Sequence, residues 1–159
     1  MATTKKKAKP QDAIALLKQD HEKVRALLGT FEKAGSGPRR EKLFAQIEQE
    51  LKVHTTIEEE IFYPAYRDAV KKKDDRELYQ EALEEHHVVD LVLPELKRAD
   101  PAGEIFGAKA KVLKELIEHH AGEEEKEMFP KARKVLGVAE LRNLGGRMQS
   151  RKRSLSKGR

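Results

Sequence analysis

The sequence contains no cysteine and no tryptophan, and aromatic residues make up only 5% of its 159 residues. The absence of cysteine excludes disulfide bonds, thiol redox chemistry and metal sites made from thiolates. No run of 18 consecutive apolar residues occurs, so a membrane-spanning helix is not expected. The opening "MATTKKKAKP" lacks the apolar stretch of a secretory signal. These absences predict a soluble, cytoplasmic protein.

Positive charge is concentrated at the two ends of the chain. Ten Lys and Arg residues lie within the first 9 and the last 13 positions, whereas the whole chain has a net charge of +5, so the remainder carries −5. Basic tails bind nucleic acid or anionic lipid by releasing counterions, although many short tails of this kind only increase solubility. Because no aromatic residue is interleaved for base stacking, weak nucleic-acid contact is kept only as a hypothesis.

The composition and the pattern of apolar residues predict an all-α fold. Charged residues make up 38% of the chain, and Ala, Leu, Glu, Lys and Arg dominate, as in proteins built from long helices. Breakers such as "GSGP" and "ADPAG" delimit helices at about 11–34, 39–63, 75–99 and 104–129, with a shorter one at about 138–151. Long helices with short connections form an up-down-up-down antiparallel four-helix bundle. The predicted divisions are a basic N-terminal tail at 1–10, the bundle at 11–135, and a short fifth helix with a basic tail at 136–159.

Each of the four long helices interrupts its apolar face with histidine. Apolar residues recur every three or four positions, as on the core-facing side of an amphipathic helix, and Val112, Leu113 and Ile117 are placed in the core on this basis. The polar residues that fill gaps in these faces are His21, His54, Glu58, His86, His120 and Glu124.

Six buried polar groups of this kind need a partner. A single buried histidine is usually hydrogen-bonded within the core, but an unpaired polar group costs roughly 1–3 kcal/mol and an ionised carboxylate more. Together these groups could consume the ~5–15 kcal/mol that stabilises a typical domain. A bound cation would satisfy all six. Imidazole with carboxylate suits iron, manganese or zinc, and two bridging carboxylates favour a dinuclear site.

The strongest signal is an internal repeat. "HTTIEEEIFYP" at 54–64 and "HAGEEEKEMFP" at 120–130 share the pattern His-x3-Glu-x5-Pro, and an acidic–His dipeptide precedes each by about 33 residues. One His-x3-Glu pair alone means little, since His119 and Glu123 also form one, but the prolines select His120. On the third helix the phase of the apolar face favours His86, whereas a strict offset of sixty-six residues selects His87.

The order His, His-x3-Glu, His, His-x3-Glu, closed by "IFYP" and "MFP", resembles the hemerythrin-like HHE cation-binding domain over about residues 11–135. The resemblance implies a four-helix bundle around a non-haem di-iron centre, with manganese or zinc as the alternatives to iron. Two glutamates and an oxo or hydroxo group would bridge the ions. The ligands carried over are His21, His54, Glu58, His86, His120 and Glu124.

One position departs from the family pattern. Asp90 stands four residues after His86, where oxygen-carrying hemerythrins have a second histidine, which argues against reversible oxygen carriage. Asp90 is either a further ligand or a solvated surface carboxylate. The first functional hypothesis is a di-iron protein that binds or processes O2, peroxide or NO, an oxidoreductase if it is an enzyme. The alternatives are an iron-sensing or iron-binding module without turnover, and a metal-free helical protein that binds nucleic acid through its tails.

Overall fold

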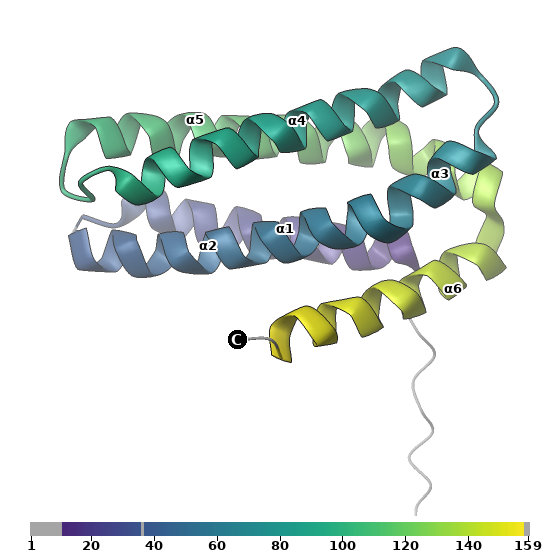
Figure 1. Ribbon diagram of the computed structural model, residues 1–159, viewed down its shortest axis with the longest axis horizontal. Helices are drawn as coiled ribbons and strands as arrows, with labels where there is room; N and C mark the ends of the chain where they lie inside the picture. Colours follow the sequence, from purple (N-terminus) through teal and green to yellow (C-terminus); the bar gives the residue numbers. More distant parts are fainter. Residues whose placement is uncertain (1–10, 36, 158–159) are drawn as a thin grey trace, which may run out of the picture.

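The computed structural model describes residues 11–35 and 37–157, and all the regular structure in these ranges is helical (Figure 1). The elements are α1 (Ala13–Lys33), α2 (Gly37–Ile57), η1 (Glu58–Phe62), α3 (Tyr63–Ala69), α4 (Lys73–Arg98), α5 (Glu104–Glu123), η2 (Glu124–Met128) and α6 (Phe129–Lys157). The predicted basic N-terminal tail at 1–10 lies outside the described residues. Across the described ranges, no helix combines the length and the apolar character that a bilayer span requires.

Four long helices lie side by side and form a bundle, which confirms the all-helical prediction (Figure 1). In this arrangement α1 packs against α2, and α4 packs against α5. Asp12 caps the start of α1, where its side chain accepts a hydrogen bond of 2.8 Å from the backbone N–H of Ala15.

The bundle core consists of two apolar clusters with polar residues between them. One cluster contains Ile14, Leu17, Phe62, Tyr66 and Leu144 among others, and the second contains Leu28, Phe44, Ile47, Leu96 and Leu113 among others. Along each long helix the buried histidine falls between a member of one cluster and a member of the other; on α1, for example, His21 lies between Leu17 and Val24. The fold therefore encloses the polar residues in the middle of the bundle.

Two π-helical turns occur at equivalent places in the repeat and were not predicted. The N–H of Tyr63 donates to the carbonyl of Glu58, and the N–H of Phe129 donates to that of Glu124. A proline follows each turn; because proline has no N–H, it cannot continue the α-helical ladder, but it is tolerated in the first turn of a new segment. The helix predicted to end near residue 63 therefore continues as α3 to residue 69.

The fifth helix is longer than predicted. Gly137 has φ 77° and ψ 170°, a conformation that breaks α6 into two parts, and the second part continues to Lys157 instead of ending near residue 151. Gly145 permits this part to cross the start of α1, because a Cβ at Gly145 would lie 2.9 Å from the backbone nitrogen of Ala13 and would collide with the carbonyl of Gln11.

Ion pairs explain why the predicted basic C-terminal tail is helical up to Lys157. Arg151 donates to Glu60 at 2.8 and 3.1 Å, and Lys152 pairs closely with Asp20. These contacts attach the last part of α6 to the bundle.

Val112 was predicted in the core, but its side chain is 47% exposed. Its neighbours Leu113 and Ile117 are 0% and 8% exposed, as predicted. The apolar stripe of α5 is wider than the surface that the neighbouring helices cover, so the residue at its edge faces solvent.

Candidate metal centre

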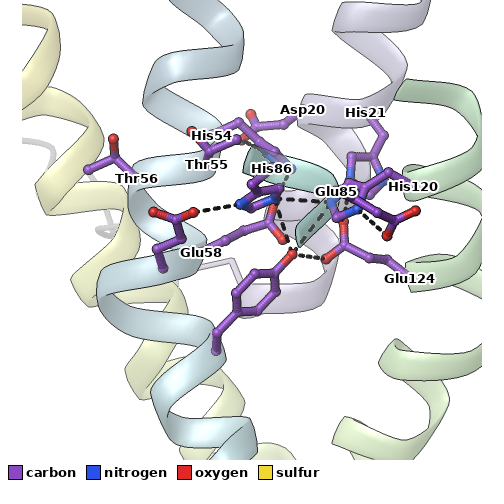
Figure 2. Close-up of polar contacts among 12 residues, drawn as sticks. Asp20, His21, His54, Thr55, Thr56, Glu58, Glu85, His86, His120 and Glu124 are labelled. Carbon is purple, nitrogen blue, oxygen red and sulfur yellow. Dashed lines mark hydrogen bonds and ion pairs between the residues drawn. The ribbon is translucent and has the colours of Figure 1, made fainter. Parts of the chain in front are cut away.

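The structure brings all six predicted site residues together in the middle of the bundle (Figure 2). One histidine comes from each long helix, and no side chain of the six is more than 11% exposed. The carboxylates of Glu58 and Glu124 are the most deeply buried, at 0% and 2% exposed. His87 and Asp90, the alternatives considered on α4, are both exposed and belong to no such group of the described residues.

The four histidines form two pairs, and two glutamate carboxylates lie between the pairs. His21 and His54 make the first pair, with ring centroids 4.9 Å apart, and His86 and His120 make the second, at 4.7 Å. Glu124 Oε1 lies 3.3 Å from His21 Nε2 and 3.0 Å from His120 Nε2. Glu58 Oε1 contacts His54 Nε2 closely and lies 3.9 Å from His86 Nε2. Each glutamate therefore contacts one histidine of each pair.

The outer nitrogen of every histidine is held by a carboxylate. His21 Nδ1 lies 3.2 Å from Glu125, His54 Nδ1 3.0 Å from Asp20, His86 Nδ1 2.9 Å from Glu59, and His120 Nδ1 3.0 Å from Glu85. An ionised carboxylate can only accept, so each Nδ1 donates. In the neutral ring the lone pair is then on Nε2, which faces the centre. This is the arrangement that metal-binding histidines have in proteins.

Five buried atoms at the centre lack a hydrogen bond, and this makes the residues fit a cation. They are His21 Nε2, His54 Nε2, both oxygens of Glu58, and Glu124 Oε1. These atoms lie close to one another, but none of them forms a hydrogen bond. Ligand atoms from His21, His54, Glu58 and Glu124 lie within 4.8 Å of one another, as do those from Glu58, His86 and His120. These buried nitrogen and oxygen donors fit a metal site.

The charges around the centre outweigh the effect of burial. Burial lowers the pKa of His54, but the carboxylates of Glu58 and Asp20 raise it to about 10. Burial alone would raise the pKa of Glu124, yet His120 and the other neighbours hold it well below its ordinary value. The glutamate stays ionised, so the centre stabilises positive charge.

Tyr63 is a site residue that the sequence analysis missed. Its hydroxyl donates to Glu124 Oε2 at 3.1 Å and lies 3.3 Å from His86 Nε2 and 3.4 Å from His120 Nε2. Burial, followed by the charges of Glu124 and Glu58, raises its pKa well above the ordinary value, so the phenol keeps its proton. The repeat contains the signal: Phe129 occupies the equivalent position and stacks on His21, as Tyr63 stacks on His86.

The sequence analysis also assigned no role to the four carboxylates that hold the outer nitrogens of the histidines. Asp20 and Glu85 are the acidic members of the two acidic–His dipeptides, and Glu59 and Glu125 each follow a predicted glutamate ligand. Because all four occupy corresponding places in the two halves of the repeat, the sequence pattern does contain a signal for them.

The second His-x3-Glu pair of α5 lies at the surface. His119 is 64% exposed, and its Nε2 is 3.4 Å from Glu85 and 3.2 Å from Glu123. Selecting His120 over His119 therefore picked the histidine that points into the bundle.

Comparisons with known proteins agree with this geometry. The sequence profile of the hemerythrin HHE cation-binding domain matches residues 12–132. A solved structure of a hemerythrin HHE cation-binding domain-containing protein from Mycobacterium kansasii is 29% identical, with a TM-score of 0.81 over 93% of this chain and 89% of that one. A protein of Nostoc sp. named DNA nickase is 27% identical over 121 residues, which are 76% of this chain. This chain spans 33% of the length of that curated relative. The family resemblance in the sequence is confirmed: the chain belongs to the hemerythrin HHE cation-binding domain family.

Proposed function

We propose that this chain is a hemerythrin-like non-haem di-iron protein that binds or processes a small oxidant: O2, peroxide or NO. The observation that carries the proposal is the convergence of imidazole nitrogens and carboxylate oxygens into two groups that share Glu58, with five of the buried atoms at the centre left without a hydrogen bond. Two groups joined by a carboxylate suit two ions, and mixed nitrogen and oxygen donors suit iron, with manganese or zinc as alternatives.

In this proposal each histidine pair would hold one ion, and Glu58 and Glu124, which contact histidines of both pairs, would serve as shared carboxylate ligands. Iron supplies Lewis acidity and one-electron redox chemistry when bound. The carboxylates behind the rings keep each Nε2 directed at the centre. The hydroxyl of Tyr63 holds a proton 3.1 Å from Glu124 Oε2, beside the second histidine pair.

A small cavity beside the histidines supports a small ligand. It has a volume of about 30 Å³, and its apolar wall contains Val24, Leu51, Val89 and Ile117. A space of roughly 10–15 Å³ on this measure holds one water, whereas sites for drug-sized molecules occupy ~300–1,000 Å³. The cavity suits a diatomic molecule or peroxide and is too small for an organic substrate. Its apolar wall also limits the entry of water.

The proposal includes the up-down-up-down antiparallel helix order and a bundle domain at 11–135. Short connections between α1 and α2 and between α4 and α5 support this order, because they join neighbouring helices end to end. The match of the family profile to 12–132 supports the domain boundaries.

Metal analysis and rapid mixing test the proposal. Protein purified without chelator should contain about two iron atoms per chain, as di-iron bundles do. The His54→Ala and His120→Ala variants should lose iron, and His119→Ala, which changes the exposed neighbour of His120, should retain it. Mixing the reduced, iron-loaded protein with peroxide or NO should change the near-UV and visible absorption. A spectrum that stays unchanged with peroxide, with NO and also with O2 would refute oxidant binding.

A second candidate is an iron-binding or iron-sensing module without turnover. The observation that favours it is the pairing of Lys152, on the last part of α6, with Asp20, which holds His54. Iron loading should then increase hydrogen-exchange protection in the last part of α6, with no consumption of peroxide or O2. Unchanged protection would exclude this candidate.

A further inference from the structure

The two histidine pairs have matching surroundings in their immediate contacts. Asp20 holds His54 as Glu85 holds His120, at 3.0 Å in both cases. Glu125 holds His21 at 3.2 Å, and Glu59 holds His86 at 2.9 Å. Each of these matches follows the internal repeat, in which Asp20 corresponds to Glu85 and Glu59 corresponds to Glu125. In the carboxylates that hold the outer nitrogens, the two halves of the centre are therefore equivalent.

Cationic side chains pair with these carboxylates behind only one of the two histidine pairs. Arg25 donates two hydrogen bonds to Glu125, at 3.0 and 2.9 Å, and Lys152 donates to Asp20. Both carboxylates behind His21 and His54 are therefore neutralised by a cation that always carries charge at neutral pH.

The carboxylates behind the second pair have no such partners. Glu59 is 43% exposed and forms no ion pair with Lys or Arg in the described ranges. Glu85 contacts only His119 in addition to His120 among the described residues. At the repeat position equivalent to Arg25 the chain has Asp90, and Lys152 comes from α6, outside the repeat.

We propose that the two ion positions are unequal, and that a divalent cation binds first and more tightly between His86 and His120; this rests on the proposed metal centre. A carboxylate that accepts from Nδ1 makes the imidazole a stronger donor, and a cation on that carboxylate weakens the effect. Arg25 and Lys152 also repel an ion in the first half directly, because their side chains are only 35% and 24% exposed and partly buried charges are screened less than fully exposed ones.

The number of ligand atoms at each ion position does not reverse the proposed order of binding. The tight group around His21 and His54 includes both glutamates, which favours the first half. However, Glu124 Oε1 lies 3.0 Å from His120 Nε2 and 3.3 Å from His21 Nε2, so this glutamate can serve either half. With similar donor sets, the fixed charges decide.

Zinc titration of the metal-free full-length protein tests the order of binding. Zinc is redox-inert, and long-range proton–nitrogen NMR spectra report the Nε2 of each histidine separately. The first equivalent should shift His86 and His120, and the second should shift His21 and His54. Calorimetry should give two steps whose dissociation constants differ by about tenfold or more, the size typical of contacts behind metal ligands.

Charge-removing variants test the cause. Arg25→Met with Lys152→Met should bring the two dissociation constants within about threefold of each other, because both cations are then absent. Lys131→Met, which removes the surface ion pair with Asp75, is the matched control and should keep both steps. Should the double variant not fold, Glu59→Gln, at an exposed side chain, should instead weaken the first step alone.

The outcomes separate this inference from the proposed function. Two ions that bind with equal affinity, or first at His21 and His54, would overturn the unequal order and leave a dinuclear centre standing. Failure to bind zinc at any of the four histidines would overturn the metal centre itself. Two steps that persist unchanged in the folded double variant would overturn the role of Arg25 and Lys152.

Discussion

Removing the cation from the folded protein should lower its melting temperature, because five buried polar atoms at the centre have no hydrogen-bond partner. Each unsatisfied buried group costs roughly 1–3 kcal/mol, so the five together represent about 5–15 kcal/mol. That sum is as large as the whole stability of a typical domain, so a cation at the centre should contribute strongly to folding.

The observable part of this gain depends on the free ion concentration. At a free concentration about 100 times the dissociation constant, a ligand that binds only the native state stabilises it by about 2.7 kcal/mol. For a domain of roughly 150–250 residues, 1 kcal/mol shifts the melting temperature by about 2–4 °C. The expected increase is therefore about 5–11 °C for each ion that binds at this concentration relative to its own dissociation constant.

Calorimetry or circular dichroism on chelator-treated protein, with and without iron(II) under anaerobic conditions, measures the shift. In the His120→Ala variant the metal-dependent increase should become smaller, because the position between His86 and His120 loses a ligand, whereas His119→Ala should keep the full increase. These adjacent histidines of α5 serve as a variant and its control, because the side chain of His120 is 11% exposed and that of His119 is 64% exposed. Equal melting temperatures of the metal-free and metal-loaded wild type would show that the buried atoms satisfy one another without a cation. A full shift that survives His120→Ala would show that the stabilising ion binds without His120.

Three further predictions concern Tyr63, pH and the last helix. Tyr63→Phe should preserve helix content but change the visible spectrum of bound cobalt(II), because the lost hydroxyl lies at the second histidine pair; an identical spectrum would contradict its place at the centre. Neighbouring carboxylates raise the pKa of His54 to about 10 and the pKa of His120 well above its ordinary value, so zinc binding at these residues must displace protons at neutral pH. The affinity should therefore fall by at least about tenfold per unit as pH is lowered from about 9 to 7. An affinity measured by chelator competition that does not change over this range would exclude His54 as a ligand. Gly145→Ala should destabilise the protein by about 1–3 kcal/mol because its Cβ would meet backbone, whereas Gly29→Ala, with open space around it, should stabilise by up to about 1 kcal/mol in urea unfolding.

The sequence predicted the helical bundle and the position of the centre because both depend on local spacing. Residues four apart lie on one face of a helix, so a polar side chain on an apolar face must point into the core wherever that face packs. His54 with Glu58 and His120 with Glu124 follow this rule, and the structure places all four at the centre. The same rule failed at Val112, because the width of the buried face depends on the neighbouring helices.

Other features depend on which segments meet in space. Periodicity gave no sign of the two π-helical turns, although Pro64 and Pro130 mark where they end. The segment predicted as a tail is helical and packs against the bundle. Gly145 allows it to approach α1 closely, and Arg151 and Lys152 pair with Glu60 and Asp20.

The repeat alone therefore determined that two equivalent sets of histidine and glutamate exist and that each belongs on a helix facing the core. Only the tertiary structure decided that the two sets share one centre, that Tyr63 adds a hydroxyl on one side, and that Arg25 and Lys152 add positive charge on the other. The physical reason is the distance along the sequence over which each kind of interaction acts. Helical spacing acts over four residues, whereas the contact of Lys152 with Asp20 joins residues 132 positions apart, and no local pattern encodes it.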